Sequence, residues 1–106
     1  MTCQRWLRSL RSAASDPVKA LKLRNVSLVI MGSESGRFGV RTMAAYAAGK
    51  SAVQCGLLHS LAQDAPRIYS RARVNAVAPG AVGTERFYEE SKLLGEEWRW
   101  RECEAT

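Results

Sequence analysis

The chain has 106 residues, of which 46% are hydrophobic and 25% are charged. This composition is typical of a globular protein and excludes intrinsic disorder, and the length corresponds to one small domain or part of a larger one. The formal net charge is +6, but the basic side chains are scattered over residues 1–84 without a basic helix or interleaved aromatic residues. This pattern argues against a nucleic-acid-binding protein.

The cysteines Cys3, Cys55 and Cys103 are odd in number and far apart, and they form no Cys-x-x-Cys pair. Such spacing favours a reduced intracellular protein over a disulfide framework or a zinc site. No apolar run approaches the ~18 residues of a membrane helix, and Met1–Leu10 lacks the apolar stretch of a signal peptide. The sequence therefore predicts a soluble, cytoplasmic protein without a metal site or a membrane contact.

The first third of the chain predicts two helices followed by a buried strand. Residues 3–14 form a weak amphipathic pattern, and Ser15-Asp16-Pro17 is a helix start for a short helix that runs to about Leu23. The apolar and β-branched run Val26–Met31 predicts a strand that is buried on both faces, as strands of parallel sheets are.

A polar loop is expected over 32–42, followed by a long helix from about Met43 to Gln63, which Asp64-Ala65-Pro66 ends. A strand over Arg73–Ala78 and a charged amphipathic helix over Thr84–Thr106 complete the chain. Strand, long helix and strand make a βαβ unit, for which a right-handed crossover is expected. The fold class is therefore α/β, with residues 1–106 forming a single domain.

The βαβ arrangement brings two special segments to one crevice. Ligands of open α/β sheets bind beyond the carboxyl ends of the strands, where Gly32–Gly36 and Pro79–Thr84 follow directly. Tyr46 and Lys50 lie four residues apart on the long helix and share one face, although this spacing is also common on solvated helices. A neighbouring ammonium favours the phenolate, which makes a tyrosine useful for proton transfer near neutral pH. The candidate site therefore combines Ser33, Tyr46, Lys50 and Thr84.

Three motifs in this order resemble the second half of the short-chain dehydrogenase/reductase family. They are Gly32-Ser33 with Gly36 and Gly39 behind it, Tyr46-x-x-x-Lys50 thirteen residues after Ser33, and Arg73-Val74-Asn75-Ala76-Val77-Ala78-Pro79-Gly80-Ala81-Val82-x-Thr84. The resemblance covers roughly residues 17–106 and implies part of a Rossmann-like, doubly wound parallel sheet. The segments Ile30–Gly36 and Trp98–Thr106 are similar to fungal members of the family.

The resemblance implies an oxidoreductase that uses NADP or NAD to reduce a carbonyl or oxidise an alcohol. Tyr46 is then the general acid or base, Lys50 favours its phenolate and binds the nicotinamide ribose, and Ser33 holds the substrate oxygen. The nicotinamide end of the cofactor is seated by Pro79, Gly80, Val82 and Thr84. Each of these roles is carried over from the family motif to the matching position.

Other family features have no counterpart in this sequence. It contains neither the Gly-x-x-x-Gly-x-Gly turn that cradles the pyrophosphate nor an Asn-Asn-Ala-Gly segment, which implies a central-to-late fragment without the N-terminal cofactor-cradle strands. Two functions stay open. One is an oxidoreductase of fungal secondary metabolism. The other is a truncated, inactive protein that at most associates with its own copy or a full-length relative through the long helix.

Overall fold

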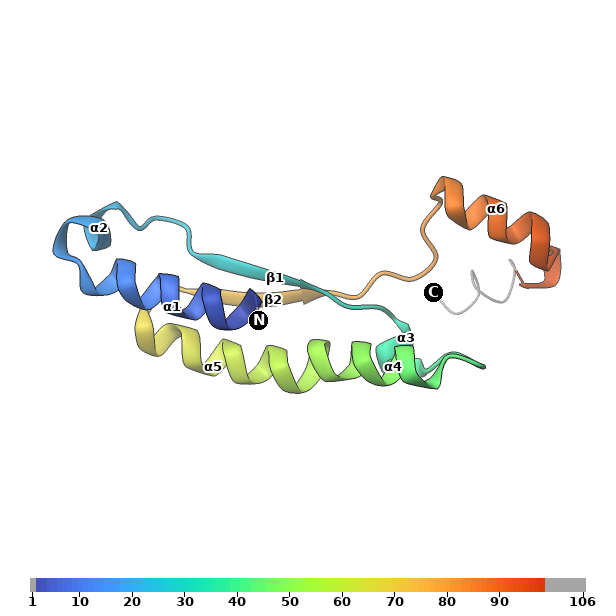
Figure 1. The fold of residues 1–106 in the computed structure, drawn as a ribbon, viewed down its shortest axis with the longest axis horizontal. Helices are drawn as coiled ribbons and strands as arrows, with labels where there is room; N and C mark the ends of the chain where they lie inside the picture. The colour runs from blue at the N-terminus through green and yellow to red at the C-terminus, as the bar shows by residue number, and fades with distance from the viewer. Residues whose placement is uncertain (1, 99–106) are drawn as a thin grey trace.

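The computed structural model describes residues 2–98 and shows a mixed α/β fold (Figure 1). The strands β1 (Ser27–Met31) and β2 (Arg73–Val77) form a parallel pair, in which Ser27 lies opposite Arg73 and Met31 opposite Val77. Between the strands, residues 44–68 form a continuous run of helical turns. It consists of α4 (Ala44–Ser51), the π-helical segment η1 (Ala52–Leu57) and α5 (Leu58–Ile68). The predicted α/β fold class is thus confirmed.

Two helices precede the sheet, α1 (Thr2–Ser15) and α2 (Pro17–Lys22). The Asp16 carboxylate accepts hydrogen bonds from the backbone amides of Val18, at 2.9 Å, and Lys19, at 3.2 Å. Pro17 stands at the first position of α2, where its missing N–H costs nothing. The predicted start of this helix is confirmed because its signal is local and complete.

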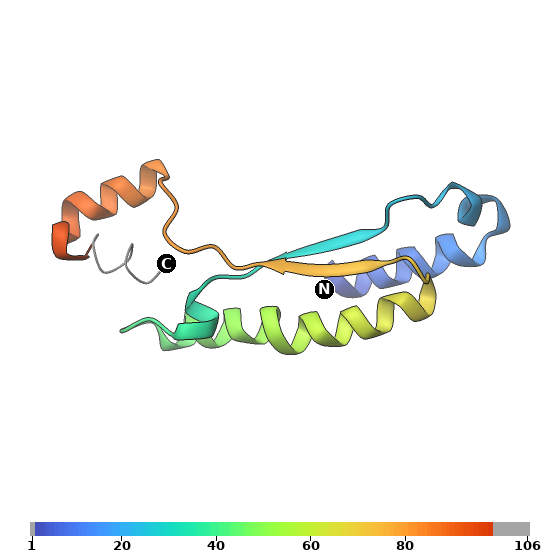
Figure 2. The same cartoon turned by 180° about the vertical axis from the view of Figure 1, so that it is seen from behind.

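The core lies between the sheet and one layer of helices. Its buried side chains come from α1, α5, the turn before β2 and β2 itself: Leu10, Leu61, Ala65, Ala72 and Val74. Leu28 and Ile30 of β1 pack against this cluster with their half-buried side chains. Alternate residues of both strands therefore point towards α1 and α5, which lie on the same side of the sheet (Figures 1 and 2).

The opposite face of the sheet is bare among residues 2–98. Val29, Met31 and Val77 point to it and are 55%, 59% and 51% exposed. The prediction of a strand buried on both faces is therefore wrong for the described chain. The reason is that these residues supply a helical layer for one face only, so the second layer of a doubly wound sheet is not formed by them.

The long helix ends later than expected. It continues through Pro66 to Ile68, and the amide of Tyr69 closes it on the Ala65 carbonyl at 3.0 Å. A proline in the last turn removes one hydrogen bond, and the fully buried Ala65 beside it is held in the core. Packing thus overrides the local stop signal at Asp64-Ala65-Pro66.

Two more expectations are corrected in the loops and at the C-terminal side. The predicted loop over 32–42 contains a short helix, α3 (Ser35–Phe38), which the Gly39 amide closes on the Ser35 carbonyl at 2.9 Å. The predicted helix over Thr84–Thr106 is interrupted, since α6 (Glu85–Leu94) ends at Gly95, whose φ of +91° is a left-handed conformation suited to glycine. The part of this prediction over 99–106 lies outside the described residues.

The described chain is long and narrow. Its principal extents are 58 × 24 × 21 Å and its radius of gyration is 18.2 Å, whereas about 13 Å is expected for a compact domain of this size. Helix α6 stands at the end of an extended arm, away from the sheet and from α5 (Figure 1). The bare sheet face and this arm leave much apolar surface in contact with solvent.

Candidate active site

The loops that follow the two strands run side by side. Beyond the sheet, the Gly32 amide donates to the Val77 carbonyl at 2.7 Å, and the Glu34 amide donates to the Pro79 carbonyl at 3.1 Å. These bonds extend the strand pairing past β1 and β2. The structure thereby brings the Gly32–Gly36 segment next to the start of the Pro79–Thr84 segment, at the carboxyl edge of the sheet.

Helix α4 presents Tyr46 and Lys50 to this edge. The Lys50 ammonium lies 5.8 Å from the centre of the Tyr46 ring, a cation–π arrangement. The same Nζ atom donates a hydrogen bond to the Met31 carbonyl, at the end of β1, with a distance of 3.1 Å. Lys50 is therefore anchored to the strand while its charge stays next to the tyrosine.

A cavity of about 410 Å³ opens beside this pair, between α1, the end of β1 and the α4–η1 helix. Its volume falls in the range of small-molecule sites, about 300–1,000 Å³. Most of its wall is apolar, and its polar groups are few. It is lined by Cys3, Ile30, Met31, Ala45, Tyr46, Gly49, Lys50, Val53 and Leu57.

Ser33 does not line this cavity and is only 9% exposed. Its amide donates to the Gln54 side-chain oxygen at 2.8 Å, and its Oγ accepts a hydrogen bond from the Ser35 amide at 3.2 Å. Because Oγ acts as an acceptor there, the hydroxyl keeps its own proton for another partner. No hydrogen bond joins the hydroxyls of Ser33 and Tyr46 in the part of the chain that the structure describes, so their joint action stays a prediction.

Gln54 contacts the Ser33 loop and is a site residue that the sequence did not reveal. A Cβ atom added at Gly32 would lie 2.3 Å from its Oε1, and one added at Gly36 would lie 2.7 Å from it. Gln54 follows Lys50 by four residues, so it continues the helix face of Tyr46 and Lys50. That spacing was the available signal, but glutamine is too common on helices for it to stand out.

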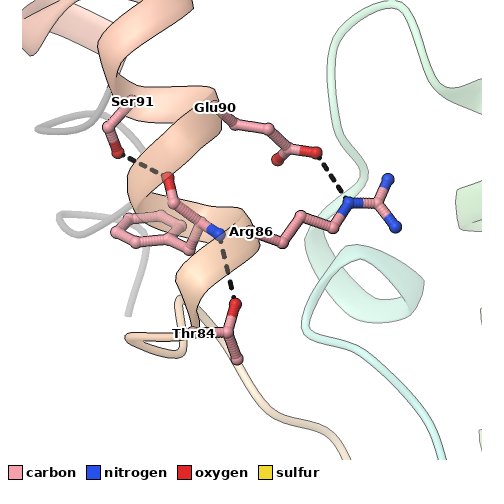
Figure 3. A network of polar contacts seen from close by, with 5 residues as sticks. Thr84, Arg86, Glu90 and Ser91 are labelled. Atoms are coloured by element: carbon pink, nitrogen blue, oxygen red, sulfur yellow. Dashed lines mark hydrogen bonds and ion pairs between the residues drawn. The ribbon is translucent and has the colours of Figure 1, made fainter.

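The predicted nicotinamide-binding residues lie along the arm that leads to α6. Thr84 caps this helix, since its Oγ1 accepts a hydrogen bond from the Phe87 amide at 3.2 Å (Figure 3). Its amide donates to the Val82 carbonyl at 2.7 Å. The structure gives Thr84 this capping task, and the contacts of Pro79, Gly80, Val82 and Thr84 with a nicotinamide stay predictions.

Two further contacts order the same helix (Figure 3). Ser91 Oγ donates to the Phe87 carbonyl at 2.7 Å, and the Arg86 guanidinium pairs with the Glu90 carboxylate at 2.9 Å. This hydrogen bond and the charge of Glu90 raise the pKa of Arg86. Trp98 packs on the Phe87 ring with 5.6 Å between the ring centres. These interactions are internal to the α6 region and do not reach Tyr46 or Lys50.

Residues 2–98 contain no metal-binding cluster and no membrane-spanning helix. No group of three or more His, Cys, Asp or Glu side chains there is arranged to hold a metal ion. None of the helices in that range has the length and apolar character needed to cross a membrane.

Comparison with known proteins identifies the family. The family model for short chain dehydrogenase matches residues 10–93, which include both strands, the helix between them and most of α6. The chain belongs to the short-chain dehydrogenase family. A search of curated proteins and a search of solved structures each returned no match.

The family uses NAD(P), and the side chains at the cavity fit one end of such a cofactor. One of the three N–H groups of Lys50 donates to the Met31 carbonyl, and the other two fit the hydroxyls of a nicotinamide ribose as donors. Tyr46 stands at the cavity wall and is 45% exposed, so its hydroxyl is within reach of a bound molecule. For the pyrophosphate, the sequence offers no Gly-x-x-x-Gly-x-Gly turn. The fit is therefore to the nicotinamide ribose half.

Proposed function

We propose that this chain carries the proton-transfer half of an NAD(P)-dependent oxidoreductase site that reduces a carbonyl or oxidises an alcohol. One observation carries the proposal. The Lys50 ammonium is anchored 3.1 Å from the Met31 carbonyl and lies 5.8 Å from the Tyr46 ring, at the wall of the 410 Å³ cavity. The pairing therefore faces a space of the size that a small substrate needs.

The chemistry assigned to the residues follows from their positions. A bound cofactor supplies the hydride. Tyr46 donates its phenolic proton to the oxygen of a carbonyl substrate, or accepts the proton of an alcohol, while the fixed charge of Lys50 stabilises the phenolate that remains. Ser33 offers its hydroxyl proton to the same oxygen, since the Ser35 amide occupies only an acceptor position of its Oγ.

The cavity wall favours a particular kind of substrate. Because most of its lining side chains are apolar, we propose a carbonyl or alcohol compound with an apolar body and its oxygen directed at Tyr46. The similarity of Ile30–Gly36 to fungal members of the family supports secondary metabolism as the setting, and the widely spaced Cys3, Cys55 and Cys103 support the cytoplasm as the location. The similarity of Trp98–Thr106 rests almost wholly on positions outside the described residues.

A second candidate function rests on the bare sheet face. Val29, Met31 and Val77 present an apolar strip that a separate domain rarely leaves open, and the sheet has only two strands in the described chain. This favours a catalytically inactive protein that associates with its own copy or a full-length relative. The small, exposed side chains of Ala44, Ala48 and Ala52 on the long helix suit close helix contact in such an association.

Reduced nicotinamide mononucleotide is the sharpest probe of the site, because it contains only the half of the cofactor that the residues fit. We expect it to bind with a millimolar dissociation constant, about −4 kcal/mol, and to shift the NMR signals of Tyr46 and Gly49. A Lys50→Ala variant should lose these shifts. Lys92→Ala, which alters an exposed lysine of α6, should keep them.

Calorimetry with NADPH and NADH separates the two functions. For the chain alone we expect affinity weaker than about 0.1 mM, or −5.5 kcal/mol, and no significant dehydrogenase activity, since the pyrophosphate lacks its cradle. Tighter binding that depends on Lys50 would remove the inactive protein from consideration. If the mononucleotide at 10 mM shifts no signal near Tyr46, the oxidoreductase proposal is wrong.

A further inference from the structure

Two side chains of the α4–η1 helix bind it to the end of β1 and to the loop that follows. Tyr46, Lys50 and Gln54 follow at intervals of four residues and therefore share one helix face. The Lys50 ammonium bonds the Met31 carbonyl at 3.1 Å, and the Gln54 Oε1 accepts the Ser33 amide at 2.8 Å. The helix that carries the proton-transfer pair thus also holds the loop that carries Ser33.

The loop is shaped to receive this glutamine. Added Cβ atoms at Gly32 and Gly36 would lie 2.3 and 2.7 Å from Gln54 Oε1, closer than real Cβ contacts. Neither glycine has a positive φ, so their backbone conformation does not demand glycine. The Gln54 amide occupies the space that such a Cβ atom would take, so a side chain at either position would displace the amide. The side chain also has a defined orientation, because only its oxygen can accept the Ser33 N–H.

The contact fixes more than the loop backbone. With its amide held by Gln54, Ser33 turns its Oγ to the Ser35 amide at 3.2 Å, and its hydroxyl proton stays free. Loss of the Gln54 oxygen would release both the amide and this orientation, since the two bonds belong to one short turn. Ser33 would then drift relative to Tyr46, which sits on the same helix as Gln54.

We propose that Gln54 is a positioning residue that holds Ser33 in place against Tyr46 and Lys50, and that it acts through Ser33 without contact to a substrate. This inference rests on the proposed function for the meaning of Ser33. Its structural content is independent of any activity. It can therefore be tested by observing Ser33 directly in the full chain.

Hydrogen exchange of the Ser33 amide, followed by NMR, measures the contact. Gln54→Leu keeps a similar volume without an acceptor and should accelerate exchange at Ser33 about 5- to 10-fold, which is the net value of one hydrogen bond. Gln54→Glu restores an acceptor and should restore protection. The Gly32 amide, which bonds Val77, is the internal reference. Gln63→Leu is the matched control, because that glutamine lies exposed on the same helix and bonds only the His59 carbonyl.

A variant that leaves Gln54 in the sequence covers the case in which Gln54→Leu does not fold. Gly36→Ala inserts a methyl group where the glutamine amide lies, at a helical position that alanine otherwise favours. It should accelerate Ser33 exchange in the same way. Unchanged exchange at Ser33 in either folded variant, or equal acceleration in Gln63→Leu, would overturn the inference.

Kinetics distinguish this inference from the function on which it rests. If the chain, or an assembly that contains it, turns over a carbonyl substrate, Gln54→Leu should lower kcat at least 10-fold while the KM for the cofactor stays unchanged. Gln54→Glu should recover part of the loss. If Ser33 exchange responds to Gln54 while mononucleotide binding and turnover are both absent, the positioning contact stands and the proposed oxidoreductase fails. If turnover is present and Gln54→Leu leaves kcat unchanged, the positioning role is wrong.

Discussion

Replacement of Leu61 by alanine tests the one-sided core. Leu61 is 5% exposed and packs from α5 against the cluster that Leu10, Ala65 and Val74 form under the sheet. Truncation of a buried leucine costs about 2–5 kcal/mol, because the lost apolar contacts leave a cavity that the surroundings fill only in part. The surroundings of Leu61 in this cluster come from α1, α5 and β2.

This loss is large for a chain with such a small core. Domains of this length have a free energy of unfolding of about 5–15 kcal/mol, and a core that covers one sheet face belongs at the low end. With an m value of about 1.5 kcal/mol per M urea, a loss of about 3 kcal/mol lowers the urea midpoint by about 2 M. We therefore expect Leu61→Ala to retain about 2 kcal/mol of an unfolding free energy near 5 kcal/mol, so that it stays mostly folded in water but unfolds at a much lower urea concentration.

Urea titration followed by far-UV circular dichroism measures the effect. Leu93→Ala is the control, since Leu93 is 85% exposed on α6 and its truncation should change the midpoint by less than about 0.3 M. Equal midpoints for the two variants would refute the packing of α1 and α5 on a shared core. A large loss in Leu93→Ala would show that α6 has a partner surface that the described chain does not present.

Two further substitutions test local contacts. Gly32→Ala places a Cβ atom 2.3 Å from Gln54 Oε1 and 3.1 Å from Gln54 Cβ, so we expect a loss of about 1–3 kcal/mol in urea titration. At the helical position Gly56, an added Cβ atom would meet no atom within 4 Å. Gly56→Ala should therefore raise the free energy of unfolding by about 1 kcal/mol, and a decrease there would contradict the reasoning. Thr84→Ala removes the cap on the Phe87 amide and should weaken α6 by about 1 kcal/mol, visible as lower helicity at 222 nm with an unchanged midpoint for the core. Thr84→Ser should retain the helicity, and equal spectra for both variants would show that this cap is not needed.

The elements that could be predicted from the sequence are those with local causes. The cap at Asp16 with Pro17 behind it acts within one turn, and the β-branched run over 26–31 carries its own preference for a strand. The proximity of the two loops followed from the general geometry of parallel strands. In the structure, the Gly32 amide bonds Val77 at the end of β2 and the Glu34 amide bonds Pro79, so the two loops do lie side by side.

The features that could not be predicted depend on tertiary contacts. The helix passes Pro66 because Ala65 is buried against the core, which a proline rule does not include. A bare sheet face cannot be inferred from an apolar strand, since the strand carries the same residues whether or not a second layer covers it. Gln54 owes its importance to Gly32 and Gly36, which are distant in sequence and adjacent only after folding.

The π-helical segment between the site and the core sets the rotation of one relative to the other. The amide of Leu58 bonds the Val53 carbonyl, five residues back, so this turn holds about one residue more than an α-helical turn. One residue of an α-helix corresponds to a rotation of about 100°. If residues 52–57 formed ordinary α-helical turns at unchanged length, Leu61 and Ala65 could stay in the core only with Tyr46 and Lys50 swung by about 100° around the helix axis, away from the end of β1. The π-helical segment therefore sets the angle between the helix face that packs in the core and the helix face that carries Tyr46 and Lys50.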